Sequence, residues 1–302
     1  MAANQRRTDI VAVAERSIVA MPRVGAHLSA AGGVSRAVDA ARTLGCRGLQ
    51  VFLRAPGRWA AAPLAAAEIA RVHASPGRRQ VAGAFLAHAP YLLNLASDSE
   101  ALRSRSIATL VDELRRAGEL GLDGVVLHPG SARDGPRGAA EGRCRTAIVE
   151  AIENAGAGAA RLLLEGQAGA GGQLGRTPAE LAALCDASLR SRVGLCLDTA
   201  HLWAAGYDLT AGGLERVLGE VAEHWDGAAP DALHINDTKV PLGSGRDRHA
   251  PPGEGILGER FYRALLSHPA LAETPMILEI PPGDGNVLVR RALNRLRRWL
   301  SK

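Results

Sequence analysis

Residues 193–201 read VGLCLDTAH, an apolar run of strand length that ends in a carboxylate at Asp198. Short runs of branched or apolar residues bounded by glycine, proline or charges are typical of buried parallel strands. Ligand-type side chains at the carboxyl ends of such strands point into the mouth of a (β/α)8 barrel, where that fold carries its chemistry. The pattern predicts a barrel with a multinuclear metal centre, because five further runs end in the same way: FLAH at His88, VVLH at His128, LLLE at Glu165, ALHI around His234 and MILE at Glu279.

Apolar runs and stretches of helical periodicity alternate along the whole chain and predict eight βα units. This alternation favours a parallel sheet, and eight repeats favour its closure into a (β/α)8 TIM barrel. The expected strands span residues 24–27, 48–53, 82–88, 123–128, 161–165, 193–198, 231–235 and 275–280. The expected helices span residues 34–44, 64–74, 99–120, 137–158, 177–188, 210–225, 257–267 and 287–300.

Local signals mark helix starts and one long connection. Ser35, Thr177 before Pro178, and Thr210 are expected to cap helices, because their side-chain oxygens can accept hydrogen bonds from free amide groups. The longest irregular connection, residues 236–256, follows the seventh strand. Long loops after barrel strands usually carry function, so we expect this loop to contribute to the site.

The length of the chain bounds its organisation. With 302 residues, of which 47% are hydrophobic, it is long enough for one barrel of about 250 residues. We expect a single catalytic domain over residues 21–302 and a flexible N-terminal extension over residues 1–20. Apolar runs fall short of the roughly 20 residues of a membrane span, and Glu15 and Arg16 interrupt the extension where a signal peptide needs an apolar core. These features predict a cytoplasmic protein.

Charge and cysteine content point to partners and redox state. The net charge is +5, and almost all of the positive charge comes from arginine. A basic chain suits a phosphate-backbone partner, although genome composition alone also enriches arginine. The sequence has no P-loop, so no nucleotide cofactor is expected. Reduced, buried thiols are expected, because no CxxC pair occurs among Cys46, Cys144, Cys185 and Cys196.

Nine side chains can be proposed as metal ligands. Asp198 and His201 stand three apart, so that a strand-end carboxylate and a histidine of the next turn can face one cavity. Asp247 and His249 have the i, i+2 spacing that points two side chains the same way in an extended loop. Imidazole and carboxylate without thiolate suit Zn²⁺, and also Mn²⁺ or Fe²⁺. Each residue alone is compatible with a structural hydrogen bond, and it is their recurrence at strand ends that indicates a metal centre. The full set is His88, His128, Glu165, Asp198, His201, His234, Asp247, His249 and Glu279.

Several segments resemble the endonuclease IV family of apurinic/apyrimidinic (AP) endonucleases, from about Val24 to Pro282. The combination DTxH…AGYD followed by HxND…GSxxDRH…GEGxxG is specific for that family. The matching segments are GAHLSAAGG (25–33), AHAPYLLNL (87–95), LHPGS (127–131), LEGQAGAGGQLG (164–175), LCLDTAHLWAAGYDL (195–209), HINDTKVPLGSGRDRHAPPGEGILG (234–258) and ILEIPP (277–282).

The resemblance implies a TIM barrel that holds three Zn²⁺ ions, with Mn²⁺ as an alternative at one site. Glu165 would bridge two of the ions, and Glu165 and Glu279 would be catalytic residues. His27 would lie beside them as a third catalytic-site residue that contacts a ligand or the phosphate, with a purely structural role equally open. The implied ligand sets are His88, His128 and Glu165; Glu165, Asp198, His234 and Glu279; and His201, Asp247 and His249.

The implied reaction is hydrolysis of the phosphodiester 5′ to an abasic site in double-stranded DNA. Its products would be a 3′-hydroxyl and a 5′-deoxyribose phosphate, as in base excision repair. Metal-activated water would attack the phosphorus, and the metal ions would neutralise the developing charge. The family also suggests a monomer. A DNA substrate implies association with the nucleoid, and no membrane partner is expected.

The resemblance also indicates which residues bind DNA. Tyr91 and Leu92 match the family's wedge into the base stack, with packing at the barrel mouth as the alternative. In the loop from Arg54 to Trp59, Gly57 stands where an intercalating arginine is usual, so Arg58 or Arg54 is expected to replace it in part. The further predicted DNA-binding residues are Lys239 and Arg248.

Two other departures from the family leave the ligands in place. Gly166-Gln167 follow Glu165 where the family commonly has Asn-Thr, which predicts different hydrogen bonding near the bridging carboxylate. Residues 280–282, Ile-Pro-Pro, follow Glu279 and are expected to alter the rim of the site.

Two other functions are open from the sequence. A sugar isomerase or epimerase of the xylose-isomerase-like barrels would share the strand-end ligands but use one or two metals. Such an enzyme needs neither the set of His201, Asp247 and His249 nor a wedge at Tyr91 and Leu92. A metal-stabilised DNA-binding protein without catalysis is the non-enzymatic alternative, and the intact ligands at all nine positions argue against it.

Overall fold

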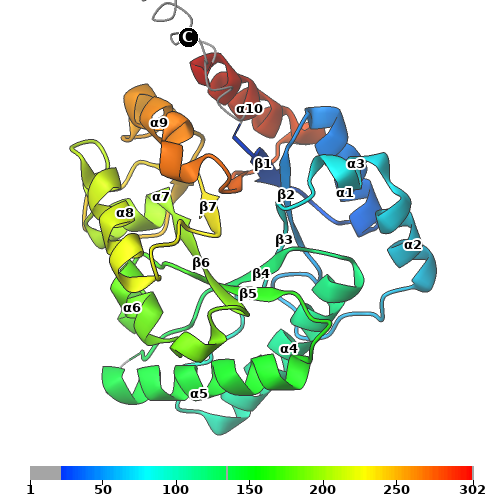
Figure 1. The fold of residues 1–302 in the computed structure, drawn as a ribbon, viewed down its shortest axis with the longest axis vertical. Helices are drawn as coiled ribbons and strands as arrows, with labels where there is room; N and C mark the ends of the chain where they lie inside the picture. The colour runs from blue at the N-terminus through cyan, green and yellow to red at the C-terminus, as the bar shows by residue number, and fades with distance from the viewer. Residues whose placement is uncertain (1–21, 134, 301–302) are drawn as a thin grey trace, which may run out of the picture.

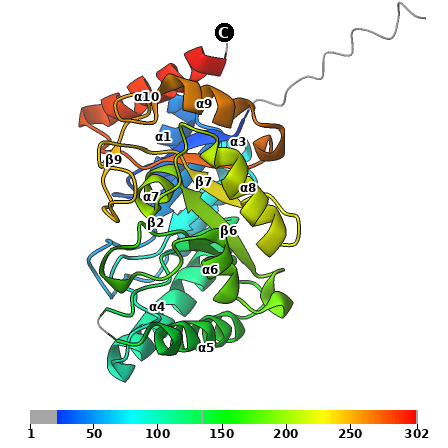
Figure 2. The ribbon, with the colours of Figure 1, turned by 90° about the vertical axis from the view of Figure 1, so that its left-hand side faces the viewer.

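The barrel predicted from the strand pattern is closed. The computed structural model describes residues 22–133 and 135–300, so the expected extension over residues 1–20 lies outside the described residues. Eight parallel strands form a ring in the order β1-β10-β7-β6-β5-β4-β3-β2, and helices surround it (Figure 1). The (β/α)8 fold class is therefore confirmed. In the side view, α9 and α10 lie together at one side of the barrel, and α4 and α5 pair at the other (Figure 2).

The expected strands and helices occur close to their predicted positions. The barrel strands are β1 (Val24–His27), β2 (Gly48–Phe52), β3 (Phe85–His88), β4 (Gly124–Leu127), β5 (Arg161–Glu165), β6 (Val193–Asp198), β7 (Ala232–His234) and β10 (Met276–Leu278). The helices are α1 (Val34–Leu44), α2 (Ala66–Ala74), α3 (Pro76–Gln80), α4 (Glu100–Glu119), α5 (Arg137–Ala155), α6 (Pro178–Ala183), α7 (Thr199–Ala205), α8 (Gly213–His224), α9 (Gly258–Ser267) and α10 (Val287–Leu300).

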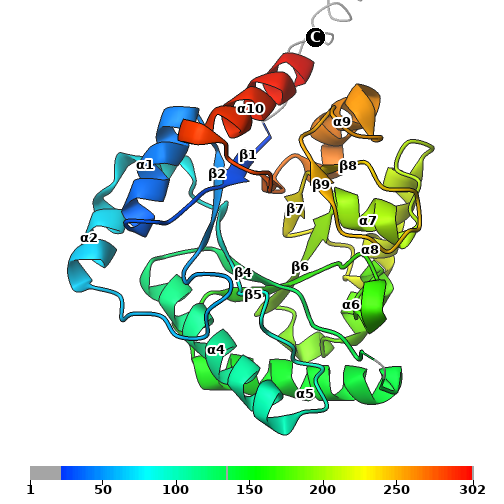
Figure 3. The ribbon, with the colours of Figure 1, turned by 180° about the vertical axis from the view of Figure 1, so that it is seen from behind.

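The long connection after β7 is more ordered than predicted. It contains an antiparallel pair of short strands, β8 (Asp237–Thr238) and β9 (His249–Ala250). This hairpin and the unpredicted helix α7 lie beside each other next to β7 (Figure 3). Because Thr238 pairs with His249, the hairpin returns the chain to the barrel mouth. The loop is thereby held at the site rather than left free above it.

Two of the three predicted helix caps are wrong. Thr177 caps α6 as expected and accepts from the backbone N–H of Glu180 at 3.1 Å. Ser35 instead lies inside α1, where its backbone N–H and its hydroxyl both donate to the carboxylate of Glu68. Thr210 lies in a turn before α8 and donates to Asp208 at 2.6 Å. In both cases a carboxylate engages the hydroxyl that was expected to cap a helix.

Strand alternation explains why the predicted ligands share one cavity. Six apolar side chains from six strands form a separate buried cluster: Leu86, Val126, Leu163, Cys196, Ala232 and Ile277. Each lies two residues before one of the six strand-end ligands. Side chains two residues apart point to the same face of a strand. The cluster therefore forms an apolar floor inside the barrel, and the ligands form the next layer above it.

Close approach of β1 and β2 requires glycine at position 25. Gly25 pairs with Gly48, and a Cβ at Gly25 would stand 1.7 Å from the Gly48 carbonyl oxygen. Backbone atoms cannot yield as a flexible side chain can. We expect Gly25→Ala to lower the free energy of unfolding by about 2–3 kcal/mol, as overpacking does. Urea denaturation measures this loss.

The matched control is Gly138→Ala, in the exposed part of α5, where an added Cβ meets nothing within 4 Å. Alanine is the better helix former, so this variant should gain roughly 0.5–1 kcal/mol. Equal unfolding midpoints for both variants would contradict the steric argument.

The thiols are buried and unpaired, as predicted. All four cysteines are free and buried. Burial raises the pKa of Cys46 to about 11, with smaller opposing effects from Arg297 and a backbone hydrogen bond, so this thiol stays protonated at neutral pH. Over the described part of the chain, no helix combines the length and hydrophobicity needed to cross a bilayer.

Candidate metal centre

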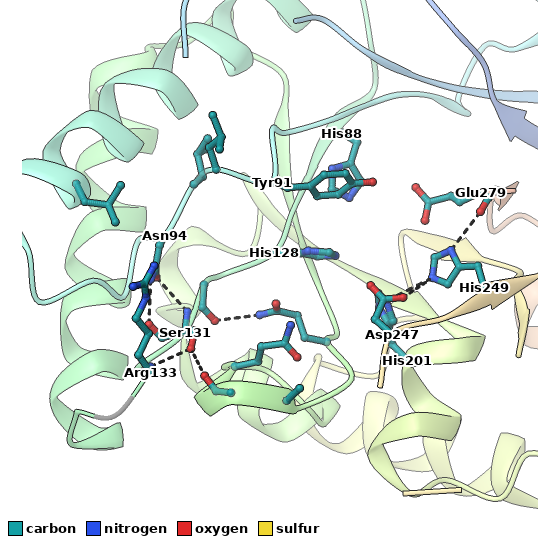
Figure 4. A pocket seen from close by; sticks show the side chains of 18 residues that line it. His88, Tyr91, Asn94, His128, Ser131, Arg133, His201, Asp247, His249 and Glu279 are labelled. Atoms are coloured by element: carbon teal, nitrogen blue, oxygen red, sulfur yellow. Dashed lines mark hydrogen bonds and ion pairs between the residues drawn. The ribbon is translucent and has the colours of Figure 1, made fainter. Parts of the chain in front are cut away.

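A cavity of ≈ 580 Å³ opens at the carboxyl ends of the barrel strands. His88, Tyr91 and His128 lie on one side of it, and His201, Asp247, His249 and Glu279 lie on the other (Figure 4). The predicted ligands that do not line the cavity lie directly beneath it and are completely buried: Glu165, Asp198 and His234. All nine predicted positions therefore converge on one region.

The first cluster joins β3, β4 and β5. The Nε2 atoms of His88 and His128 lie 3.1 Å and 2.9 Å from the same oxygen, Glu165 Oε2. Nε2 of His128 is buried and, among the described residues, has no hydrogen-bond partner besides this short contact with Glu165. Two imidazole nitrogens that converge on one carboxylate oxygen in this way suit a cation.

The second cluster uses the other oxygen of Glu165. Oε1 lies 2.9 Å from His234 Nδ1, which is in turn 3.0 Å from Glu279 Oε2 and 4.0 Å from Asp198 Oδ2. Each oxygen of the Glu165 carboxylate thus faces a different group of candidate ligands. This is the bridging arrangement expected for Glu165.

The third cluster depends on α7 and the β8–β9 hairpin. His201 Nε2 and His249 Nε2 face each other at 3.5 Å, and the two oxygens of Asp247 lie 3.3 Å and 3.2 Å from them. Asp198 caps α7 by accepting from the backbone N–H groups of Ala200 and His201, which fixes the first turn and so directs His201. Asp247 is half-exposed, so this cluster is the one open to solvent.

Backbone carbonyls orient three of the imidazoles. Nδ1 of His88 lies 2.7 Å from the Ala89 oxygen, Nδ1 of His201 lies 2.8 Å from the Gly166 oxygen, and Nδ1 of His249 lies 3.1 Å from the Glu279 oxygen. A carbonyl can only accept, so each Nδ1 carries a proton, and each Nε2 is the atom that would present a lone pair to a bound cation. The ligands are thereby set in one tautomer.

Charge within the site is strongly coupled. Burial raises the pKa of the Glu165 carboxyl, but the neighbouring His234 and His128 outweigh it and hold the pKa well below its usual range. Burial lowers the pKa of His201, while Asp198, Asp247 and Glu165 raise it to about 10. The Glu165 carboxylate is therefore ionised at neutral pH. Imidazolium protons balance its charge until a cation takes their place.

The donor set fits more than one metal ion. In three groups of described residues the donor atoms all lie within 4.8 Å of one another: His88, His128 and Glu165; Asp198, His201 and His249; and Glu165, Asp198, His234 and Glu279. The first and third of these groups have the members that the resemblance implies, whereas the second contains Asp198 in place of Asp247, which lies 3.3 Å from His201 and 3.2 Å from His249. All donors are imidazole nitrogen or carboxylate oxygen, which suit Zn²⁺, Mn²⁺ or Fe²⁺.

Sequence reasoning missed two buried amides. Asn236 donates from Nδ2 to Asp198 Oδ2 at 2.6 Å and accepts from the Glu279 backbone N–H at 2.8 Å. Gln50, in the middle of β2, contacts His234, Glu279 and His27. A single signal was available in each case, a polar residue within an otherwise apolar strand run or directly after it. His27 lies where expected, with Nδ1 3.6 Å from Glu279 Oε1.

The two departures beside Glu165 are accommodated by hydrogen bonds. Gly166 supplies the carbonyl that orients His201. Gln167 is buried, and its Nε2 donates to the carbonyls of Gly130 at 3.1 Å and Leu174 at 2.9 Å. These bonds tie together the loops that follow β4 and β5. Gln167 therefore braces the rim of the cavity from two loops.

The predicted DNA-binding residues fall into two groups. Tyr91 is 60% exposed, and its ring lies 6.0 Å from that of His128, while Leu92 lines the cavity beside it. Arg58, Lys239 and Arg248 are exposed.

Arg54 is buried, unlike the other predicted DNA-binding residues, so the prediction that it contacts DNA has to be corrected. Its side chain is only 3% exposed. It donates to Glu113 and Asp112, each at 2.5 Å, and to the carbonyl of Trp59. All of its guanidinium nitrogens are engaged within the protein, so a structural role replaces the DNA contact.

Comparisons with known proteins agree with this geometry. A family model described as "Xylose isomerase-like TIM barrel" matches residues 38–299. Proteins named "Probable endonuclease 4" from Nitratidesulfovibrio vulgaris and Methanoculleus marisnigri are 43% and 41% identical. They cover 92% and 90% of this chain and 99% of their own lengths.

Solved structures show the same relationship. Endonuclease IV from Thermus thermophilus superposes with a TM-score of 0.79 at 35% identity, covering 93% of this chain and 99% of its own. A D-tagatose 3-epimerase-like protein shares the fold alone, with a TM-score of 0.66 at 18% identity over 92% of this chain and 97% of its own. The chain belongs to the endonuclease IV family of xylose isomerase-like TIM barrels.

Proposed function

We propose that this protein is a zinc-dependent AP endonuclease that cleaves the phosphodiester 5′ to abasic sites in double-stranded DNA. The products would be a 3′-hydroxyl and a 5′-deoxyribose phosphate. The observation that carries the proposal is the position of Glu165, whose two oxygens face separate ligand groups beside a third group on His201, Asp247 and His249. Three adjoining donor groups suit a phosphodiester, which carries charge on several oxygens at once.

Bound Zn²⁺ ions would supply an activated water near neutral pH and offset negative charge on the phosphate. The protein's own residues prepare that chemistry. Glu165 holds the first two groups at a fixed separation, and the apolar floor of the barrel keeps bulk water from beneath them. Asp247 and His249, on the hairpin, complete the solvent-facing side where a DNA strand would arrive.

Substrate selection rests on the cavity rim. Tyr91 is exposed next to the first ligand group and Leu92 lines the same cavity, so an apolar wedge stands beside the site. Unstacking costs least where a base is missing, which favours abasic nucleotides. Arg58, Lys239 and Arg248 would contact the backbone. We also propose that the protein acts as a monomer without a nucleotide cofactor and works on DNA in the cytoplasm.

Cleavage of an end-labelled duplex with one abasic-site analogue tests this function. We expect incision that a strong chelator abolishes and that Zn²⁺ restores, with Mn²⁺ tested in parallel. A DNA polymerase should extend the upstream fragment directly, because its end is a 3′-hydroxyl. A matched duplex without the lesion is the control. Absence of incision by fully metal-loaded protein would overturn the proposal and favour the epimerase alternative, which phosphorylated sugars would then test.

A further inference from the structure

Gln50 links two ligands that belong to different strands. It is completely buried on β2, and its partners come from β1, β7 and the segment after β10. Its Oε1 lies 2.9 Å from His234 Nε2, and its Nε2 donates to Glu279 Oε1 at 2.6 Å. The same Nε2 lies 3.0 Å from His27 Nδ1. One amide therefore contacts two ligands of the second group and the histidine beside them.

The chemistry of the partners fixes how the amide is oriented. An ionised carboxylate can only accept, so the NH₂ of Gln50 must face Glu279 and its oxygen must face His234. The Gln50 oxygen also only accepts, so His234 Nε2 carries a proton. This leaves Nδ1 of His234 to face Glu165 Oε1 and Glu279 Oε2, at 2.9 Å and 3.0 Å.

Burial of this amide needs an explanation that packing does not give. Its strand reads GLQVF, and apolar residues suffice to fill a barrel interior. A buried amide without partners costs several kcal/mol, so the glutamine is tolerated because both of its ends are satisfied. The partners that satisfy it are the ligands themselves.

We propose that Gln50 is a positioning residue for the second ligand group, which fixes the tautomer of His234 and the orientation of the Glu279 carboxylate. This inference rests on the proposed metal-dependent function and deepens it. Gln50 would act through its hydrogen-bond partners His234, Glu279 and His27. Hydrogen bonds of this kind to metal ligands change metal affinity by about 10–100-fold.

Two variants of similar size separate hydrogen bonding from packing. Gln50→Met keeps the volume and removes both hydrogen bonds. Gln50→Glu keeps an acceptor for His234 but places an acceptor against Glu279 Oε1. We expect both to weaken binding of one Zn²⁺ by about 10–100-fold and leave the other ions in place. Zinc content at equilibrium with chelators of graded strength measures this, and the visible spectrum of the Co²⁺-loaded protein reports the altered coordination.

Thr274→Val is the matched control, because it removes a buried hydrogen bond to the Pro230 carbonyl away from the metal ligands. It should retain zinc as the wild type does. Wild-type zinc affinity in both Gln50 variants would overturn the positioning role. If the wild type itself binds no zinc, the proposed function fails instead, so the two failures are distinct. Should one variant not fold, as judged by its unfolding transition, the other still decides the question.

Discussion

Replacement of Glu165 by glutamine is expected to reduce incision of abasic DNA by on the order of 10³-fold or more. Metal ions lower the activation free energy of phosphodiester cleavage by several kcal/mol, and roughly 1.4 kcal/mol corresponds to a factor of ten in rate. Glu165 is completely buried, with Oε2 shared by His88 and His128 and Oε1 facing His234. A single change therefore disturbs two ligand groups at once.

Glutamine has the volume of glutamate but lacks its charge and replaces one oxygen by an amide NH₂. That NH₂ would face either the histidines of the first group or His234 of the second, where a donor meets no free lone pair once a cation is bound. We expect loss of one or two tightly bound metal ions together with the loss of kcat/KM. Metal content by elemental analysis and single-turnover incision at saturating Zn²⁺ measure the two effects.

Glu113→Gln is the control for this experiment. Glu113 is also a completely buried carboxylate, but its partner is Arg54 and it lies outside the three ligand groups. The Glu113→Gln variant should be less stable than the wild type but contain the same amount of metal. A Glu165→Gln protein that keeps all its metal and cleaves as fast as the wild type would remove Glu165 from the mechanism.

The convergence of the candidate ligands was predictable because its signal is local. Strand alternation places Leu163 and Glu165 on one face, and the same two-residue step occurs at the end of five other strands. An apolar run with a ligand-type end is therefore enough to place a side chain in the barrel mouth. The spacing in LDTAH also predicted correctly that Asp198 and His201 face one cavity, because Asp198 caps the helix whose first turn carries His201.

The supporting contacts were not predictable because they depend on register between distant segments. Gln50 meets His27 through the pairing of β2 with β1, and it meets His234 across 184 positions of sequence. The β8–β9 hairpin leaves no strand pattern in the sequence, because each of its strands has only two residues. Arg54 was assigned to DNA for a similar reason, since nothing near it in sequence shows that α4 supplies two carboxylates.

Replacement of Arg54 by alanine is expected to lower the free energy of unfolding by roughly 3–5 kcal/mol, the cost of removing one partner from a buried ion pair. Stability is lost because the partners of Arg54 remain in place without their hydrogen-bond donor. Glu113 has a fully buried side chain, and its Oε2 has no hydrogen-bond partner within the described residues even when Arg54 is present. Asp112 and the Trp59 carbonyl lose the same donor. Arg58→Ala, in the same loop but exposed, should change stability by less than about 0.5 kcal/mol.

The pH dependence of this loss identifies its cause. Burial already raises the pKa of Glu113 above its ordinary value of 4.5, although Arg54 opposes the shift, so removal of Arg54 raises the pKa further. A carboxyl whose pKa is higher in the folded state favours folding below its unfolded pKa, and this advantage is lost as pH rises through the folded value. The difference in stability between wild type and Arg54→Ala should therefore be small near pH 4 and grow towards neutral pH. Urea denaturation at several pH values measures it.

The double variant Arg54→Met, Glu113→Leu should recover most of the stability at neutral pH, because it leaves no unpaired charge at Glu113. A pH-independent loss would instead assign the effect to packing around Trp59.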